Sequence, residues 1–197
     1  MIEYGEMIQM NWKKILIKYL LLFFLMLQDV MAYEEAEYKV VYQGNNFEIR
    51  FYDERVVVQA QSNSGNNSFR KLFNYISGKN QVEEKIEMTT PVTELLENNK
   101  MIMQFYLPSR FDANSAPLPA DNSLEIATID AGYFAVIQYS GFASNKNFNK
   151  HAQILKSSLD LKGVKILSQP IKATYDGPFT LPQLRRNEAM FLVNWNK

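Results

Sequence analysis

The chain offers few side chains for covalent or metal chemistry. Among its 197 residues it has a single histidine, His151, and no cysteine. The lack of cysteine excludes thiolate nucleophiles, disulfide bonds, iron–sulfur clusters and zinc-finger sites. With one imidazole, any mechanism that requires two histidines is excluded as well.

The remaining motifs do not indicate an enzyme. The glycines never fall at the spacing of a nucleotide-binding loop, and no G-x-S-x-G nucleophile motif occurs. The acidic clusters Glu34–Glu37 and Glu83–Glu87 lack the D-x-D-x-D-G pattern of a cation loop, so we interpret them as solvated surface. Lys plus Arg and Asp plus Glu both total 21, without a basic stripe, which argues against a nucleic-acid partner. We therefore predict no catalytic residue, no metal site and no enzymatic activity.

A binding site for a small molecule is better supported, on a helix predicted after Ser68. Arg70 and Phe73, three residues apart, would place a cation beside an aromatic ring, as a flat apolar ligand with carboxylates requires. The alternative is a surface arginine above a core phenylalanine. Four apolar residues recur at the i, i+3, i+4 and i+7 positions of this amphipathic helix, which Gly78 ends: Phe69, Leu72, Phe73 and Ile76.

Strand patterns fill most of the remaining chain. Apolar and polar residues alternate over 38–42 and 47–52, with a hairpin turn between them at Gly44-Asn45-Asn46. Further strands are predicted over 56–60 and 101–107. Residues 108–123 are rich in Pro, Ala, Asn and Ser, and they predict a long surface loop where a partner could make contact.

The second half of the chain repeats the first. Val136–Tyr139 matches Val57–Ala60, and the same offset along the chain places His151 on Leu72. We expect Ala173–Phe179 to correspond to Lys85–Val92, with Pro178 near the place of Pro91.

The repeat predicts the fold class. A single unit leaves one apolar sheet face uncovered, and pairing two units buries it. We expect one α+β domain over residues 33–197: a distorted antiparallel β-barrel or curved sheet flanked by two helices. Its closing strand, Glu188–Asn194, would correspond to Met101–Leu107.

His151 is a third candidate binding residue. Its imidazole could be an axial ligand of a haem iron. The repeat, however, places it on the apolar side of its helix with Phe148 and Leu155, and this position favours a packing histidine.

Near the C-terminus, Arg185 and Arg186 precede Glu188 at the start of the last strand. Two arginines beside a carboxylate predict an ion-pair network that ties down the strand. The functional alternative is a site for an anion.

The N-terminal stretch, residues 1–32, resembles a targeting segment. Lys13 and Lys14 precede the apolar run Ile15–Leu27, and small or β-branched residues follow at Val30–Ala32. This pattern predicts a secretory signal peptide cleaved near Ala32, and therefore a periplasmic or extracellular protein. The alternative is an uncleaved anchor, because residues 10–31 could nearly span a bilayer; only in that case do we expect contact with a membrane.

The stretch Lys85–Val92 reads Lys-Ile-Glu-Met-Thr-Thr-Pro-Val. It predicts a strand that runs into a bend, because Pro91 cannot donate to a sheet. The stretch resembles the hallmark motif of the SOUL (haem-binding protein) family: a basic residue, an apolar one, then Met-Thr-x-Pro-Val. Further landmarks of that family follow in order across the span from about Tyr38 to Val193: Phe134–Gly141, Tyr175–Pro178 and Arg185–Glu188.

The resemblance implies a distorted β-barrel with two helices, similar to the effector-binding domains of bacterial regulators. It also implies a cofactor, since some animal members bind haem or another tetrapyrrole in a shallow groove on the first helix, with basic residues at its edge. Carried over by position, that groove would include Arg70 and Phe73, and Tyr75 stands where the family has a second basic residue. The alternative is an effector-domain-like module for a different apolar or anionic ligand.

Overall fold

The computed structural model describes residues 17–19, 33–62 and 67–196. The chain divides into two units, Met1–Ala32 and Tyr33–Lys197, and the second contains the folded domain. The signal segment predicted over residues 1–32 lies outside the described residues, apart from 17–19. Within the described part of the chain, no helix is both long and apolar enough to cross a membrane.

The predicted hairpin around Gly44–Asn46 is confirmed, and the structure contains a second hairpin nearer the middle of the chain. β2 (Tyr38–Gln43) and β3 (Glu48–Tyr52) pair around the Gly44–Asn46 turn. β6 (Val92–Glu97) and β7 (Lys100–Tyr106) pair around Asn98 and Asn99. Both asparagines have positive φ, 50° and 62°, a region that asparagine tolerates better than most residues.

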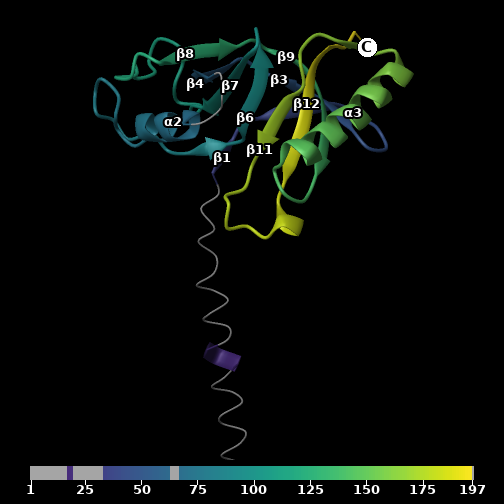
Figure 1. Ribbon diagram of the computed structural model, residues 1–197, viewed down its shortest axis with the longest axis horizontal. Coiled ribbons are helices and arrows are strands. Elements are labelled where there is room, and N and C mark those ends of the chain that lie inside the picture. Colours follow the sequence, from purple (N-terminus) through teal and green to yellow (C-terminus); the bar gives the residue numbers. More distant parts are fainter. Residues whose placement is uncertain (1–16, 20–32, 63–66, 197) are drawn as a thin grey trace, which may run out of the picture. The chain divides into compact units, whose positions relative to one another are not determined.

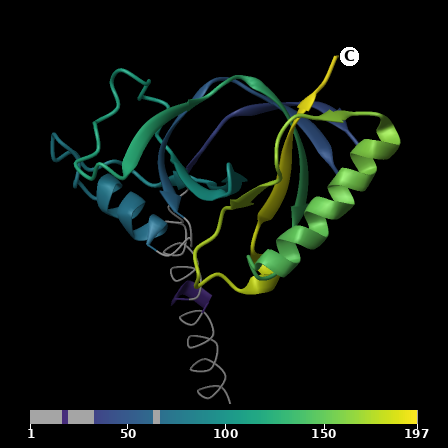
Figure 2. The ribbon, with the colours of Figure 1, turned by 45° about the horizontal axis from the view of Figure 1, so that its top comes forward.

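A single curled sheet carries the domain, as Figure 2 shows. Its strands follow the order β2-β3-β9-β12-β11-β6-β7-β4-β8, and every neighbouring pair on this path is antiparallel. A two-residue strand, β10 (Lys165–Ile166), adds to β12, and β1 (Glu34–Glu35) pairs in parallel with β5 (Thr89–Thr90). The remaining strands are β4 (Arg55–Ser62), β8 (Leu124–Ile129), β9 (Gly132–Tyr139), β11 (Ile171–Thr174) and β12 (Asn187–Asn194).

The strand order confirms the internal repeat and the predicted fold class. β6 and β11 pair at the centre of the sheet, and outward from them β7 and β4 on one side match β12 and β9 on the other. Each half also gives a strand to the other, since β3 pairs with β9 and β8 pairs with β4. The two halves therefore form one inseparable sheet.

The register corrects one detail of the predicted repeat. β11 pairs with β6 so that Thr174 lies opposite Val92. Pro170, which the offset of the repeat places on Pro91, precedes β11 as Pro91 precedes β6. The match of Ala173–Phe179 to Lys85–Val92 was wrong because Pro178 belongs to the loop after its strand, whereas Pro91 comes before its strand.

The stretch Lys85–Val92 is also less regular than predicted. Residues 85–88 form no strand, and only Thr89–Thr90 pairs, as β5. Thr89 faces inward, and its hydroxyl donates to the Tyr106 carbonyl oxygen at 2.6 Å. The motif therefore helps to build the domain interior.

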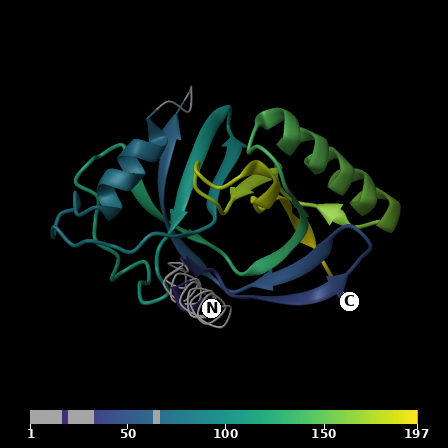
Figure 3. The same ribbon diagram turned by 90° about the horizontal axis from the view of Figure 1, so that it is seen from below.

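Two helices cover different parts of the sheet, α2 (Ser68–Ile76) and α3 (Asn145–Lys162), and Figures 1 and 3 show them well apart. α2 packs on Val58 and Phe105, and α3 packs on Ile137 and Phe191. Alternate strand residues serve the opposite face, where Phe134 and Val136 of β9 join a third buried cluster.

The loop over residues 108–123 is less exposed than predicted. Ala116 and Pro117 are buried, and the Tyr75 hydroxyl of α2 donates to the Pro117 carbonyl oxygen at 2.7 Å. Gln81 N–H donates to the Leu118 carbonyl oxygen at 2.9 Å. The loop thus holds α2 in place from outside the sheet.

Candidate functional site

The outer surface of α2 carries two stacked aromatic rings. Phe69 and Phe73, four residues apart, have ring centroids 6.2 Å apart and an interplanar angle of 10°. Both side chains are about half exposed. The Phe69 ring also meets Phe105 of the sheet edge-on, with centroids 5.2 Å apart, so the pair is fixed to the core.

The burial pattern of α2 explains why these rings reach solvent. The sequence predicts a core stripe centred on the Phe69 and Phe73 side, but the buried stripe lies further round the helix. The four residues that face the sheet are Ser68, Leu72, Tyr75 and Ile76. Phe73 is therefore not a core phenylalanine, as the alternative interpretation expected, because about half of its side chain is open to solvent.

Arg70 adds a positive charge to the same helix. Its side chain is exposed, and among the described residues it has no hydrogen-bond or ion-pair partner. The next residue, Lys71, differs because its Nζ donates to Ser123 Oγ at 2.7 Å. We call Phe69, Phe73 and Arg70 the aromatic shelf.

Tyr75 does not belong to the shelf. Its side chain is buried against the sheet, and burial raises the pKa of its hydroxyl to about 12. In the family that the sequence resembles, this position holds a second basic residue of the groove. Here the Tyr75 side chain points into the core instead. Phe69, which the sequence pattern assigned to the core, takes part in the shelf instead; its i, i+4 spacing to Phe73 was the available signal.

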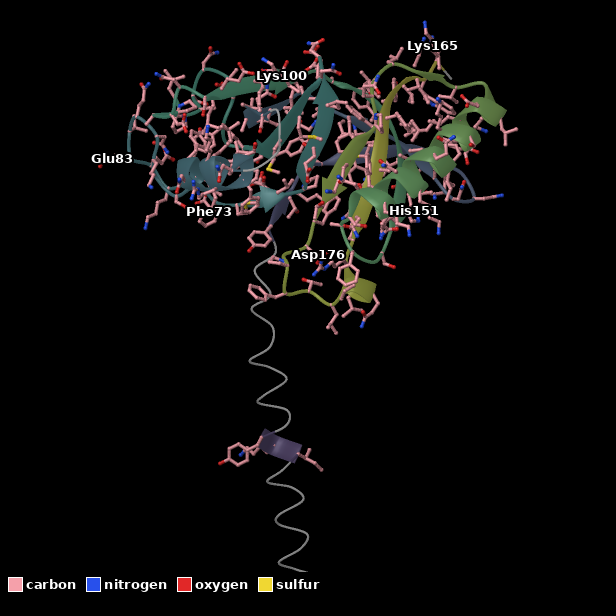
Figure 4. The ribbon with its side chains drawn as sticks, in the orientation of Figure 1. Phe73, Glu83, Lys100, His151, Lys165 and Asp176 are labelled. Atoms are coloured by element: carbon pink, nitrogen blue, oxygen red, sulfur yellow. The ribbon has the colours of Figure 1, made fainter. Side chains whose placement is uncertain are left out.

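His151 lies on α3, away from the shelf, as the labels of Phe73 and His151 in Figure 4 show. Its ring stacks on Tyr139 at 4.1 Å between centroids and 3° between planes. Its Nδ1 lies 2.8 Å from the Asn147 carbonyl oxygen. The structure thus brings Arg70 and Phe73 onto one surface and leaves His151 packed in another.

The predicted ion-pair network at the last strand is present, and it is larger than the sequence indicated. Glu188 is fully buried in β12, and both of its oxygens accept from Arg50 at 2.9 and 3.0 Å. The Tyr175 hydroxyl donates to it at 2.8 Å and Arg186 Nη2 at 2.8 Å. Arg186 in turn forks onto Glu35 at 2.8 and 2.9 Å.

The charged groups of this network are already paired with one another. Burial alone would lower the pKa of Arg50, but the hydrogen bonds and charge of Glu188 outweigh it and hold that pKa above its ordinary value. Burial, followed by the charge of Glu188, raises the pKa of the Tyr175 hydroxyl. Because the carboxylate already has two guanidinium partners, we assign the network to structure, as the sequence favoured. Arg185 stands outside it and donates to loop carbonyls.

A pocket of about 400 Å³ opens between β1, the start of β4 and the loop after β7. Arg55 stacks on the Tyr52 ring, with Cζ 4.2 Å from the centroid, and it is the one cationic residue among the described residues that line the pocket. Six acidic residues also line it: Glu34, Glu35, Glu37, Asp53, Glu54 and Asp112. The pocket therefore has a negative potential that disfavours anionic ligands.

Comparison with known protein families shows to which family the chain belongs. The model of the SOUL heme-binding protein family matches residues 33–192, which is nearly all of the folded domain. The chain belongs to the SOUL family. Among curated relatives, this SOUL protein is 27% identical over 175 residues to Heme-binding protein 1 of Xenopus tropicalis, covering 85% of this chain and 86% of the relative. It is 29% identical over 172 residues to Heme-binding protein 2 of Homo sapiens, with 79% and 81% covered.

Solved structures agree on the fold of the SOUL domain. The EcmrR C-terminal domain superimposes with a TM-score of 0.57 at 14% identity, covering 78% of this chain and 98% of that one. A hydrolase from Listeria innocua superimposes with a TM-score of 0.54 at 8% identity, covering 78% and 94%. At these identities the likeness concerns the fold alone.

The heme-binding family and relatives support haem as a possible cofactor, and two exposed aromatic rings beside a cation have the chemistry that such a ligand requires. Phe69 and Phe73 would contact the macrocycle, and Arg70 would pair with a propionate. A bound haem would supply the tetrapyrrole chemistry, while these three residues would hold and orient it.

Proposed function

We propose that this SOUL protein is a non-enzymatic binder of haem or another tetrapyrrole, and that the ligand lies on the aromatic shelf of α2. The observation that carries the proposal is the pair of stacked, half-exposed rings beside an arginine without a partner among the described residues. An exposed apolar patch rimmed by a polar or charged residue is a feature of ligand-binding surfaces.

The shelf suits a weak, reversible complex. Each ring contact contributes about 0.5–1.5 kcal/mol beyond the area it buries, and the Arg70–propionate pair adds a charge-assisted hydrogen bond. A one-sided shelf leaves the other face of the disc in water, so we expect affinity of roughly micromolar Kd.

Charge favours the shelf over the acidic pocket. A tetrapyrrole with two propionates carries negative charge, and six acidic residues line that pocket. Placing the propionates there would set like charges together in a confined space, which costs free energy.

A hemin titration of the purified protein tests the proposal. We expect a saturable shift of the Soret band at micromolar hemin, and at least a tenfold weaker Kd, about 1.4 kcal/mol, in Phe69→Ala/Phe73→Ala. Phe142→Ala is the matched control, because Phe142 is an exposed aromatic residue outside the shelf. No saturable shift, or equal loss in the control, contradicts the proposal.

The contribution of Arg70 is measured in the same titration. Arg70→Ala removes the propionate partner, and we expect a severalfold increase in Kd that shrinks at high salt. Lys165→Ala is the control, since Lys165 is also exposed and lies on a distant part of the domain in Figure 4. An esterified porphyrin without free carboxylates should bind both Arg70→Ala and the unchanged protein alike.

A different flat, apolar anion could use the same shelf. Thermal-shift screening of such compounds distinguishes the two cases, because a ligand at 100 times its Kd stabilises the fold by about 2.7 kcal/mol. If one of these compounds stabilises the protein more than hemin does and competes with hemin, it is the preferred ligand of the shelf.

We also propose that the protein is exported. The basic residues, the apolar run and the small-residue exit within residues 1–32 support this. A fusion of residues 1–40 to a reporter enzyme that is active only after export should be active. Activity no higher than that of a fusion lacking residues 1–32 would contradict export.

A further inference from the structure

The loop between β11 and β12 presents apolar side chains to solvent. Figure 1 shows this yellow loop, with the short 3-10 helix η1 (Pro182–Leu184), projecting from the end of the sheet. Phe179 is 98% exposed, and Leu181 and Leu184 are also exposed. Residues 177–184 contain no charged side chain. We call Phe179, Leu181, Leu184 and the nearby exposed Phe142 the apolar tip.

Hydrogen bonds hold the tip in this shape. Arg185 Nε donates to the Thr180 carbonyl oxygen at 2.8 Å, and its Nη2 donates to the Pro178 carbonyl oxygen at 2.6 Å. Gly141 N–H donates to the Pro182 carbonyl oxygen at 2.8 Å, which joins the Phe142 loop to the tip. These bonds satisfy part of the tip's backbone internally while its apolar side chains stay exposed.

The charges next to the tip are already committed. Arg186 pairs with Glu35 and Glu188, and Arg185 binds the loop carbonyls. No cation of the tip itself remains to attract an anionic surface. Whatever covers the tip must therefore be held by apolar contact.

The first strand of the folded domain lies next to the end of this loop. The Arg186–Glu35 ion pair ties β1 to the segment that follows the tip. Glu35 lies two positions after Tyr33, a reach of about 7 Å. Residues 1–32 precede Tyr33 in the sequence, and the proposal below does not depend on whether they are cleaved.

From these observations we propose that the apolar tip inserts into the interfacial region of a lipid bilayer. Phe and Leu gain free energy on entering that region. A narrow projection of four side chains is small for a stable protein interface, which buries about 800 Å² per partner, but it can enter a bilayer. The bilayer surface is an interaction beyond the tetrapyrrole site, which lies on α2.

Site-specific labelling tests this proposal. Because the chain has no native cysteine, an introduced cysteine is the single site of labelling. Phe179→Cys and Leu161→Cys are each labelled with the environment-sensitive dye NBD in the full chain. Leu161 is 92% exposed, which matches Phe179, and it precedes β10, which pairs with the end of β12 opposite the tip. The emission of each labelled chain is compared with and without phosphatidylcholine vesicles.

We expect a blue shift and brighter emission on vesicles at position 179, quenching there by nitroxide-labelled lipid, and none of these at position 161. The signal should persist in high salt, and Leu181→Ser/Leu184→Ser in the Phe179→Cys background should weaken it. An unchanged spectrum at 179, or an equal shift at 161, overturns the proposal. A blue shift at 179 that nitroxide lipid does not quench also overturns it, because the tip would then be buried against protein.

Discussion

Glu188 shows how a buried charge is stabilised by local geometry. Its carboxylate is fully buried in β12, yet it accepts hydrogen bonds from Arg50, Arg186 and Tyr175. A bidentate guanidinium pair offsets the desolvation of both groups only when such additional hydrogen bonds complete it. Since Arg50 comes from β3 and Glu188 from β12, the network also joins distant parts of the chain.

Replacing this carboxylate should therefore be costly. In Glu188→Gln the amide keeps the shape but deprives buried Arg50 of its main counter-charge, and we expect the free energy of unfolding to fall by about 3–5 kcal/mol. Urea denaturation measures this loss of unfolding free energy. Glu87→Gln is the control, because Glu87 pairs with Arg110 at the exposed surface and should leave the urea midpoint unchanged. Equal effects of the two substitutions would contradict this view of the network.

At the scale of elements, local patterns predicted most of the fold. The hairpin of β2 and β3, α2 and the repeat all follow from residue spacing and turn chemistry along short stretches. Two features did not, because long-range contacts decide them. Tertiary packing turned α2 so that Tyr75 is buried and Phe73 exposed, and strand pairing made Pro170 the counterpart of Pro91.

The end of α3 provides a prediction at this scale. Gly163 caps the helix with φ 69° and ψ 26°, and a Cβ there would meet nothing within 4 Å. Gly163→Ala should therefore cost about 1–2 kcal/mol from backbone strain alone. A Cβ at Gly177 also meets nothing, and Gly177 is not left-handed, so Gly177→Ala should be neutral or stabilise by up to about 1 kcal/mol. Thermal unfolding of both variants gives the comparison, and similar melting temperatures would argue against the strained cap.

At the scale of the whole molecule, the curled sheet separates three surfaces of different character. The aromatic shelf lies on α2, the acidic pocket lies beside β1, and the apolar tip follows β11. The sequence located Arg70 and Phe73 of the shelf because both lie on one short helix. It could not locate the pocket, whose lining comes from β1, β4 and the loop after β7, since only the fold brings these segments together.

The folded domain should lose stability in alkali, because burial raises the pKa of several tyrosines above the ordinary value of 10.0, to about 12 for Tyr75 and Tyr139. A raised pKa means that the folded state holds the phenolic proton more tightly than the unfolded chain does. The stabilisation is complete below pH 10 and is lost as the pH rises from 10 through 12, by up to about 1.4 kcal/mol per pH unit for each tyrosine.

Urea midpoints measured across this range should fall steeply above pH 10 and change little between pH 8 and 10. Tyr75→Phe removes one of these groups, so its stability should start lower, through loss of the hydrogen bond to Pro117, yet fall with a shallower slope. If the slope of Tyr75→Phe equals that of the unchanged protein, Tyr75 titrates alike in both states and its burial does not couple folding to pH.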